Sequence, residues 1–129
     1  MSQEKDGSKT LFLDTYAIYA ISVGSLNYKV YSAGFRFITT IMNLYELYYR
    51  LIQDNFLLEA EMFFQKFLPD CIEINPEFIK EAAIFRLQNK KLDLSYIDAL
   101  GYIIAKKHSA KFLTGDEEFK KFENVEFVK

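Results

Sequence analysis

The sequence predicts one α/β domain over residues 1–129, with a central parallel sheet of four to five strands and helices on both faces. Short aromatic or β-branched runs alternate with longer segments whose apolar residues recur at helical spacing, which is typical of strand–helix–strand units. With 50% hydrophobic and 17% aromatic residues, a chain of this length can build one large core. It contains no internal repeat, linker or low-complexity tract.

The amino-terminal part of the chain is expected to form a strand and a helix, because an apolar run is followed by a helical segment that ends at a glycine. Residues 1–9 are polar and are expected to form a flexible lead, and residues 10–13 a short buried strand. A helix over 14–23 follows and ends before Gly24. Residues 27–34 stay ambiguous between a loop and a second short helix.

The next elements are a strand and a predicted helical hairpin. Residues 35–39 are mostly aromatic or branched, which favours a second strand. From residue 41 leucines recur at helical spacing opposite a polar side, which predicts an amphipathic helix over 41–53. A further helix over 56–68 ends before Pro69.

The second half begins with an expected third strand at 71–74. Asn75 and Pro76 then match the cap and the first position of a helix that reaches about residue 88. Another helix is predicted over 95–107. The last elements are a strand at 111–114, a short helix at 116–122 and a possible fifth strand at 125–128.

Four acidic residues occupy positions that this fold brings to one edge of the sheet. Asp14 follows the first strand, and Asp116 follows the strand at 111–114. Right-handed crossovers make these two strands neighbours at the topological switch point, where ligands bind in open parallel sheets. Glu46 lies in the helix after the second strand, and Asp98 near the start of the helix that enters strand 111–114.

Each of these acids also has a purely structural explanation. Asp14 and Asp116 could cap the helices that follow them. Glu46 could pair with Arg50 at i,i+4, and Asp98 could complete a Ser-x-x-Asp capping box. Capping does not require all four to face one cleft, whereas a site for Mg²⁺ or Mn²⁺ does, because hard oxygen ligands suit these ions and relieve the repulsion between carboxylates.

The remaining chemistry-bearing residues point away from other mechanisms. Cys71 cannot form an internal disulfide and lies in an apolar run, which favours a buried inert thiol. His108, the only histidine, has no partner for a zinc site and is expected to interact with carbonyls at a helix end. No glycine-rich phosphate loop and no nucleophile motif is present.

Charge and hydropathy limit the class of partner. The net charge of −2 and the pI near 5.5 weigh against strong non-specific phosphate binding without excluding a nuclease. The lysine clusters are expected to be solvated helix ends. No segment reaches the roughly 18 to 20 apolar residues of a membrane span, and residues 1–9 lack a secretory signal core, so a cytoplasmic location is expected.

Five strings together resemble the PIN domain family. They are LDT at 13–15, YEL at 45–47, DAL at 98–100, IAK at 104–106 and LTGDEEF at 113–119. Any one string is weak, but the ordered set is specific and spans about residues 10 to 128. The resemblance implies a Rossmann-like three-layer sandwich and a Mg²⁺- or Mn²⁺-dependent nuclease acting mostly on single-stranded RNA.

This stand-alone chain looks most like the VapC-like toxins of toxin–antitoxin pairs, which implies an antitoxin partner and a homodimer. The resemblance makes Asp14, Glu46, Asp98 and Asp116 both the catalytic and the metal-binding residues, with one or two ions held among them. Thr114 and Thr15 are expected to support the carboxylates with their hydroxyl groups.

Two positions depart from the family pattern. Tyr16 stands where a small polar residue is usual, so its ring could narrow the cleft or stack on a base. Asn43 stands one turn before Glu46, where a small or hydroxyl residue is common.

Two functions follow from these observations. The leading hypothesis is an RNA endonuclease that acts as a toxin, and the alternative is a non-catalytic PIN-like domain that binds RNA or serves as a scaffold or regulator. Retention of four like charges weighs against the alternative.

An aromatic set in 41–68 is expected mostly in the core, with any excess available to a dimer or an antitoxin; its members are Tyr45, Tyr48, Tyr49, Phe56, Phe63, Phe64 and Phe67.

Overall fold

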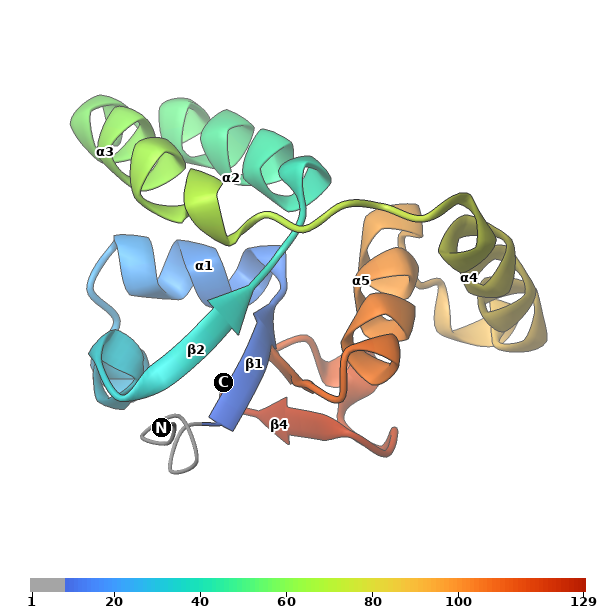
Figure 1. Ribbon diagram of the computed structural model, residues 1–129. Helices are drawn as coiled ribbons and strands as arrows, with labels where there is room; N and C mark the ends of the chain where they lie inside the picture. The colour runs from blue at the N-terminus through green and yellow to red at the C-terminus, as the bar shows by residue number, and fades with distance from the viewer. Residues whose placement is uncertain (1–8) are drawn as a thin grey trace.

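The computed structural model describes residues 9–129 and contains a four-stranded parallel sheet in the order β2-β1-β3-β4 (Figure 1). The strands are β1 (Lys9–Leu13), β2 (Phe35–Ile38), β3 (Lys111–Thr114) and β4 (Val125–Phe127). The helices are α1 (Thr15–Ser22), α2 (Ile41–Gln53), α3 (Leu57–Phe67), α4 (Pro76–Gln88) and α5 (Tyr96–Lys107). The predicted α/β class and parallel sheet are therefore confirmed, with four strands.

The sheet is the middle layer of three. Leu11 and Leu13 of β1 point to the face that α1, α2 and α3 cover, whereas Phe12 points to the face under α5. In Figure 1 the α2–α3 hairpin and α1 lie on one side of the strands, and α4 and α5 lie on the other. Gly101 lets α5 approach closely, because a Cβ there would lie 2.7 Å from the Phe12 ring.

Side-chain caps fix the starts of four helices where the sequence predicts them. In each case a polar side chain accepts a hydrogen bond from a backbone amide of the first turn. The capping residues are Asp14, Thr40, Asn75 and Ser95. These caps set the direction in which each helix leaves the carboxyl edge of the sheet or approaches it.

The predicted strand at 71–74 is wrong. Only Cys71 pairs with the sheet, through an isolated parallel bridge to Thr39. β2 ends at Ile38, so the backbone beyond the bridge has no strand to pair with. Ile72 and Ile74 instead pack on the core beneath α5, which reproduces the alternating pattern of a strand. The Ile72 amide makes one hydrogen bond of the bridge, to the Thr39 carbonyl at 2.9 Å, and the ladder does not continue.

Two smaller boundaries also differ from the sequence prediction, and the segment that the sequence left ambiguous is a short helix. Lys9 belongs to β1 rather than to the predicted flexible lead, and residues 1–8 lie outside the described residues. The ambiguous segment after α1 is a 3₁₀ helix, Leu26–Ser32. The helix predicted at 116–122 is only a 3₁₀ turn, Glu117–Phe119, because the chain must turn back quickly to enter β4.

The strand order places β1 and β3 side by side at the switch point. The chain runs from β1 through α1 to β2 on one side, then crosses to β3 on the other side of β1. The amide of Asp14 donates to the carbonyl of Leu113 at 3.3 Å, so the two carboxyl ends are held together. Among residues 9–129, every helix is too short or too polar to cross a membrane.

Candidate active site

A cavity of about 430 Å³ opens at the carboxyl edge of β1 and β3. It brings together all four of the acidic residues that the sequence singled out. The lining residues are Asp14, Thr15, Tyr16, Glu46, Arg50, Ser95, Asp98, Gly115, Asp116, Glu117 and Lys129. The acids come from four separate segments, and the topology alone brings them to one place.

Asp14 is the most buried of the four acids, at 1% exposure. Its Oδ1 accepts a hydrogen bond from the amide of Ala17 at 2.9 Å, which caps α1. Its Oδ2 accepts a short hydrogen bond from the hydroxyl of Thr114. The capping role that the sequence offered as an alternative is therefore real, and the same carboxyl group also lines the cavity.

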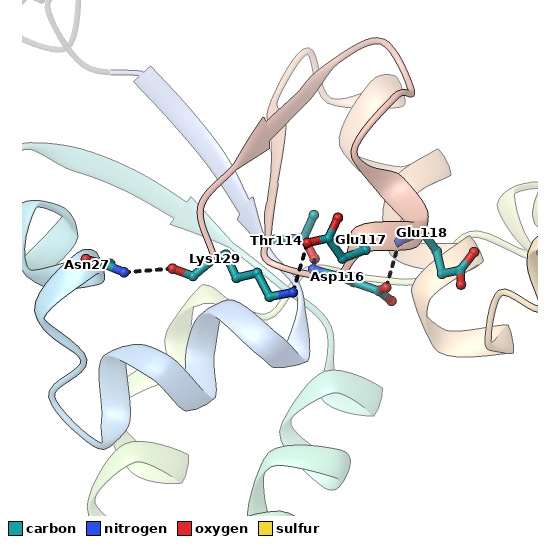
Figure 2. Close-up of polar contacts among 6 residues, drawn as sticks. All are labelled: Asn27, Thr114, Asp116, Glu117, Glu118 and Lys129. Atoms are coloured by element: carbon teal, nitrogen blue, oxygen red, sulfur yellow. Dashed lines mark hydrogen bonds and ion pairs between the residues drawn. The ribbon is translucent and has the colours of Figure 1, made fainter.

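Thr114 joins the two sides of the cavity through one hydroxyl group. Its Oγ1 donates to Asp14 and accepts from the amide of Asp116 at 3.0 Å. The Oδ1 of Asp116 in turn accepts from the amide of Glu118 at 2.9 Å, as Figure 2 shows. The expected supporting role of Thr114 thus has a direct geometric basis, since this side chain orients one acid and the backbone of another.

Glu46 is held by a buried chain of hydrogen bonds. The Thr15 hydroxyl donates to its Oε1 at 2.6 Å, and Asn43 Nδ2 donates to the Thr15 oxygen at 3.2 Å. The Thr40 hydroxyl completes the chain by donating to Asn43 Oδ1 at 2.7 Å. Each donor in the relay points toward Glu46, so the chain of hydrogen bonds fixes the orientation of its carboxylate.

Asn43 is a residue whose function the sequence analysis missed. It was noted only as a departure from the family pattern, yet its side chain is fully buried and bridges Thr40 to Thr15. The expected support from Thr15 is seen here as a hydrogen bond to Glu46, the carboxylate at the end of the relay. The signal available in the sequence was an amide side chain one helical turn before an acidic residue.

Asp98 occupies the first turn of α5, where its amide donates to the Ser95 hydroxyl at 3.0 Å. This contact is one half of the predicted capping box. The predicted pair between Glu46 and Arg50 does not form among residues 9–129, because Arg50 lies over the ring of Tyr19 instead, 4.9 Å from its centroid.

The acids disfavour one another's ionisation. Burial raises the pKa of Asp14 well above its ordinary value, the Thr114 hydrogen bond opposes that rise, and the charges of Asp98 and Asp116 add to it. Burial, with the charge of Glu46 next in size, raises the pKa of Asp98 to about 6. The cavity thus holds more negative charge than it can stabilise without a proton or a cation.

The donor set fits a hard divalent cation in chemical type. Within residues 9–129 no three Asp, Glu, His or Cys side chains converge as a ready metal-binding group, so the site is an open acidic cavity rather than a closed cage. Mg²⁺ commonly uses one or two carboxylates together with water and substrate phosphates, which an open cavity permits.

Two further features of the cavity arise from residues far apart in the chain. The half-buried ring of Tyr16 lies against Gly115, where a Cβ would come within 2.2 Å of the ring and 2.6 Å of the Val128 carbonyl. Lys129 donates to Glu117 at 2.8 Å, and its carbonyl accepts from Asn27, as Figure 2 shows. Tyr16 therefore lines the cavity beside Gly115, and only glycine fits at position 115.

The residues expected to be inert lie outside this cavity. The thiol of Cys71 is partly buried, and burial raises its pKa, as does the charge of Asp70. His108 ends α5, and its Nδ1 lies 3.1 Å from the carbonyl of Ile104, as predicted for a residue at a helix end. Neither residue lines the acidic cavity.

The protein is an α/β domain with an acidic cavity at the carboxyl edge of its parallel sheet. The family model of the PIN domain matches residues 11–125. The chain therefore belongs to the PIN domain family. No curated protein matches the chain in sequence.

Solved structures share the fold over nearly the whole chain. A toxin–antitoxin complex from Klebsiella pneumoniae has a TM-score of 0.71 at 15% identity, covering 90% of this chain and 95% of that chain. VapC20 of Mycobacterium tuberculosis, described as a Sarcin-Ricin loop cleaving toxin, has a TM-score of 0.75 at 16% identity, covering 92% and 99%. VapBC2 of Rickettsia felis, bound to a DNA fragment from its promoter, has a TM-score of 0.67 at 20% identity, covering 93% and 99%.

Proposed function

We propose that this protein is a metal-dependent endoribonuclease that hydrolyses RNA phosphodiester bonds and acts as the toxin of a toxin–antitoxin pair. One observation carries the proposal: carboxylates from four separate segments line a single cavity at the switch point of the sheet. Membership of the PIN domain family and the fold shared with a Sarcin-Ricin loop cleaving toxin support it.

In this proposal Asp14, Glu46, Asp98 and Asp116 hold one or two Mg²⁺ or Mn²⁺ ions. When bound, the metal supplies Lewis acidity that activates water and stabilises charge on the phosphate oxygens. Thr114 fixes the Asp14 carboxyl group through its hydroxyl. The buried relay that ends at Glu46 keeps that carboxylate oriented toward the cavity.

A protein partner is part of the same proposal. The structures from Klebsiella pneumoniae and Rickettsia felis contain both toxin and antitoxin, and this chain has their fold. α3 and α4 expose large apolar side chains that an antitoxin or a second copy would cover; the most exposed are Leu57, Leu58, Ile84 and Leu87. Of the aromatic set in 41–68, only Tyr45 and Tyr49 are more than half exposed.

The direct test is cleavage of a mixed pool of structured and single-stranded RNA with Mg²⁺, Mn²⁺ or EDTA. The wild type is compared with Asp98→Asn and Asp116→Asn, and with Glu73→Gln as a control for loss of an exposed carboxylate outside the cavity. We expect metal-dependent cutting that both cavity variants abolish while their circular dichroism stays native. Full activity in either cavity variant would refute the assignment.

A second function is a PIN domain that binds RNA or a partner without cutting. The acidic pI near 5.5, and the lack of a ready metal-binding group within the described part of the chain, favour it. Thermal melting with Mn²⁺ separates the two functions, because a ligand that binds only the folded state raises the midpoint. A folded wild type that binds RNA or a protein partner, but neither cuts RNA nor responds to metal, would support this second function.

A further inference from the structure

The outer face of α2 lines further cavities beside the acidic one. Arg50 lines that cavity and two more, of about 260 and about 450 Å³. The smaller one contains Tyr19, and the larger one contains Glu46, Tyr45 and Tyr49. Glu46 and Arg50 line both the acidic cavity and the larger one, so the larger cavity is next to the proposed active site.

Arg50 is an oriented cation that forms no ion pair within the described residues. Its guanidinium group lies over the Tyr19 ring, and no carboxylate of residues 9–129 forms an ion pair with it. The other cation of the acidic cavity, Lys129, is paired with Glu117 at 2.8 Å. Arg50 is therefore the better placed of the two to bind an anion that enters the site.

Tyr45 and Tyr49 present aromatic rings on the same face of α2, four residues apart. They are 68% and 57% exposed, and within residues 9–129 neither ring stacks on another aromatic side chain. Tyr48, in the same helix, is different: its ring packs against Phe64 and its hydroxyl donates to Glu61. Two of these three rings are thus available to a ligand.

We propose that Arg50, Tyr45 and Tyr49 form a subsite for one unpaired nucleotide of the RNA, next to the phosphate that is cleaved. Arg50 binds a phosphate of this nucleotide, and the tyrosine rings stack on its base. The inference rests on the proposed function. The four carboxylates repel the RNA backbone, so a cation without an ion pair beside them is well placed to hold a phosphate of the substrate.

The subsite selects for single-stranded substrate. A base in a duplex has both faces covered by its neighbours, so it cannot stack on a side chain without being unpaired. RNA is a better occupant than a protein because the surface shares Glu46 and Arg50 with the acidic cavity and combines a cation without an ion pair with two exposed aromatic rings.

The test measures binding of a fluorescein-labelled single-stranded RNA by anisotropy in EDTA, where metal-dependent cleavage is absent. Arg50→Ala, Tyr45→Ala and Tyr49→Ala are each expected to weaken binding at least about fivefold. Arg50→Ala is also expected to reduce the salt dependence of binding by about one counterion. The matched controls Tyr48→Phe and Tyr49→Phe should bind as the wild type does, and affinity for a duplex should be unchanged by either tyrosine-to-alanine variant.

The outcomes separate this inference from the proposed function. If the wild type cuts RNA and the Arg50 and Tyr49 variants bind and cut it equally well, the subsite is refuted and the nuclease stands. If the same variants change the oligomeric state by light scattering while RNA affinity stays constant, the surface is a protein interface and the inference is overturned. A folded wild type that neither binds nor cuts RNA overturns both.

Discussion

Replacing Asp98 with asparagine should make the metal-free protein more stable at pH 8. The pKa of Asp98 is raised from 3.8 to about 6, and each unit corresponds to about 1.4 kcal/mol, so the ionised form costs about 3 kcal/mol. The variant loses a favourable charge at the start of α5, worth about 0.3 to 1 kcal/mol. The expected net gain is about 2 kcal/mol, or an increase in Tm of roughly 5 to 10 °C.

The gain should depend on pH with a definite sign. The pKa of Asp98 is higher in the folded state than in the unfolded state. Between about pH 4 and pH 6 the folded state therefore keeps a proton that the unfolded state has lost, and the stability that this provides is complete below about pH 4. This contribution is lost as the pH rises through about 6. Asparagine cannot lose a proton, so the advantage of the variant should be near zero at pH 4 and complete above about pH 7.

The assay is urea unfolding in EDTA at pH 4.5, 6 and 8, followed by circular dichroism. Glu73→Gln removes an exposed carboxylate outside the cavity and should change stability by less than about 0.5 kcal/mol at each pH. The reasoning is refuted if Asp98→Asn is no more stable than the wild type at pH 8, or if its advantage is the same at pH 4.5. Added Mn²⁺ should raise Tm more in the wild type than in the variant.

Three further substitutions test contacts around the cavity. Thr114→Val removes the hydroxyl that donates to Asp14 and should cost about 1 to 3 kcal/mol in urea unfolding; an unchanged midpoint would contradict its bridging role. Gly115→Ala forces a Cβ against the ring of Tyr16 and should cost about 1 to 3 kcal/mol. A double-mutant cycle with Tyr16→Ala should recover part of that loss, and strict additivity would argue against the contact. Asn43→Asp removes the amide donor from the relay and should cost about 2 kcal/mol or more at pH 8 but less at pH 5; equal losses at both pH values would contradict the relay.

The sequence predicted those parts of the fold that depend on local pattern. The leucine spacing in α2 and the Asn75–Pro76 start of α4 are local signals, and both helices lie where they were expected. The segment at 71–74 failed because its apolar residues alternate for another reason. Ile72 and Ile74 pack on the core below α5, and whether a strand lies alongside is a property of the whole sheet.

The acids of the candidate site could be predicted because strand order alone brings their segments to one edge. Their supporting contacts could not. The relay through Asn43 depends on α1 and α2 lying side by side, and the contact of Tyr16 with Gly115 joins residues about a hundred positions apart. Arg50 shows a further limit, because i,i+4 spacing is compatible with an ion pair to Glu46 and also with the observed position over the Tyr19 ring.

The placement of β1 between β2 and β3 sets the order in which activity can arise during synthesis. β1, α1 and α2 leave the ribosome first and already carry Asp14 and Glu46. Asp98 and Asp116 follow much later, and Thr114 can orient Asp14 only after β3 has paired with β1. A nascent chain therefore has no complete cavity, and any hydrolytic capacity of this protein begins only after its carboxyl-terminal strands have emerged and joined the sheet.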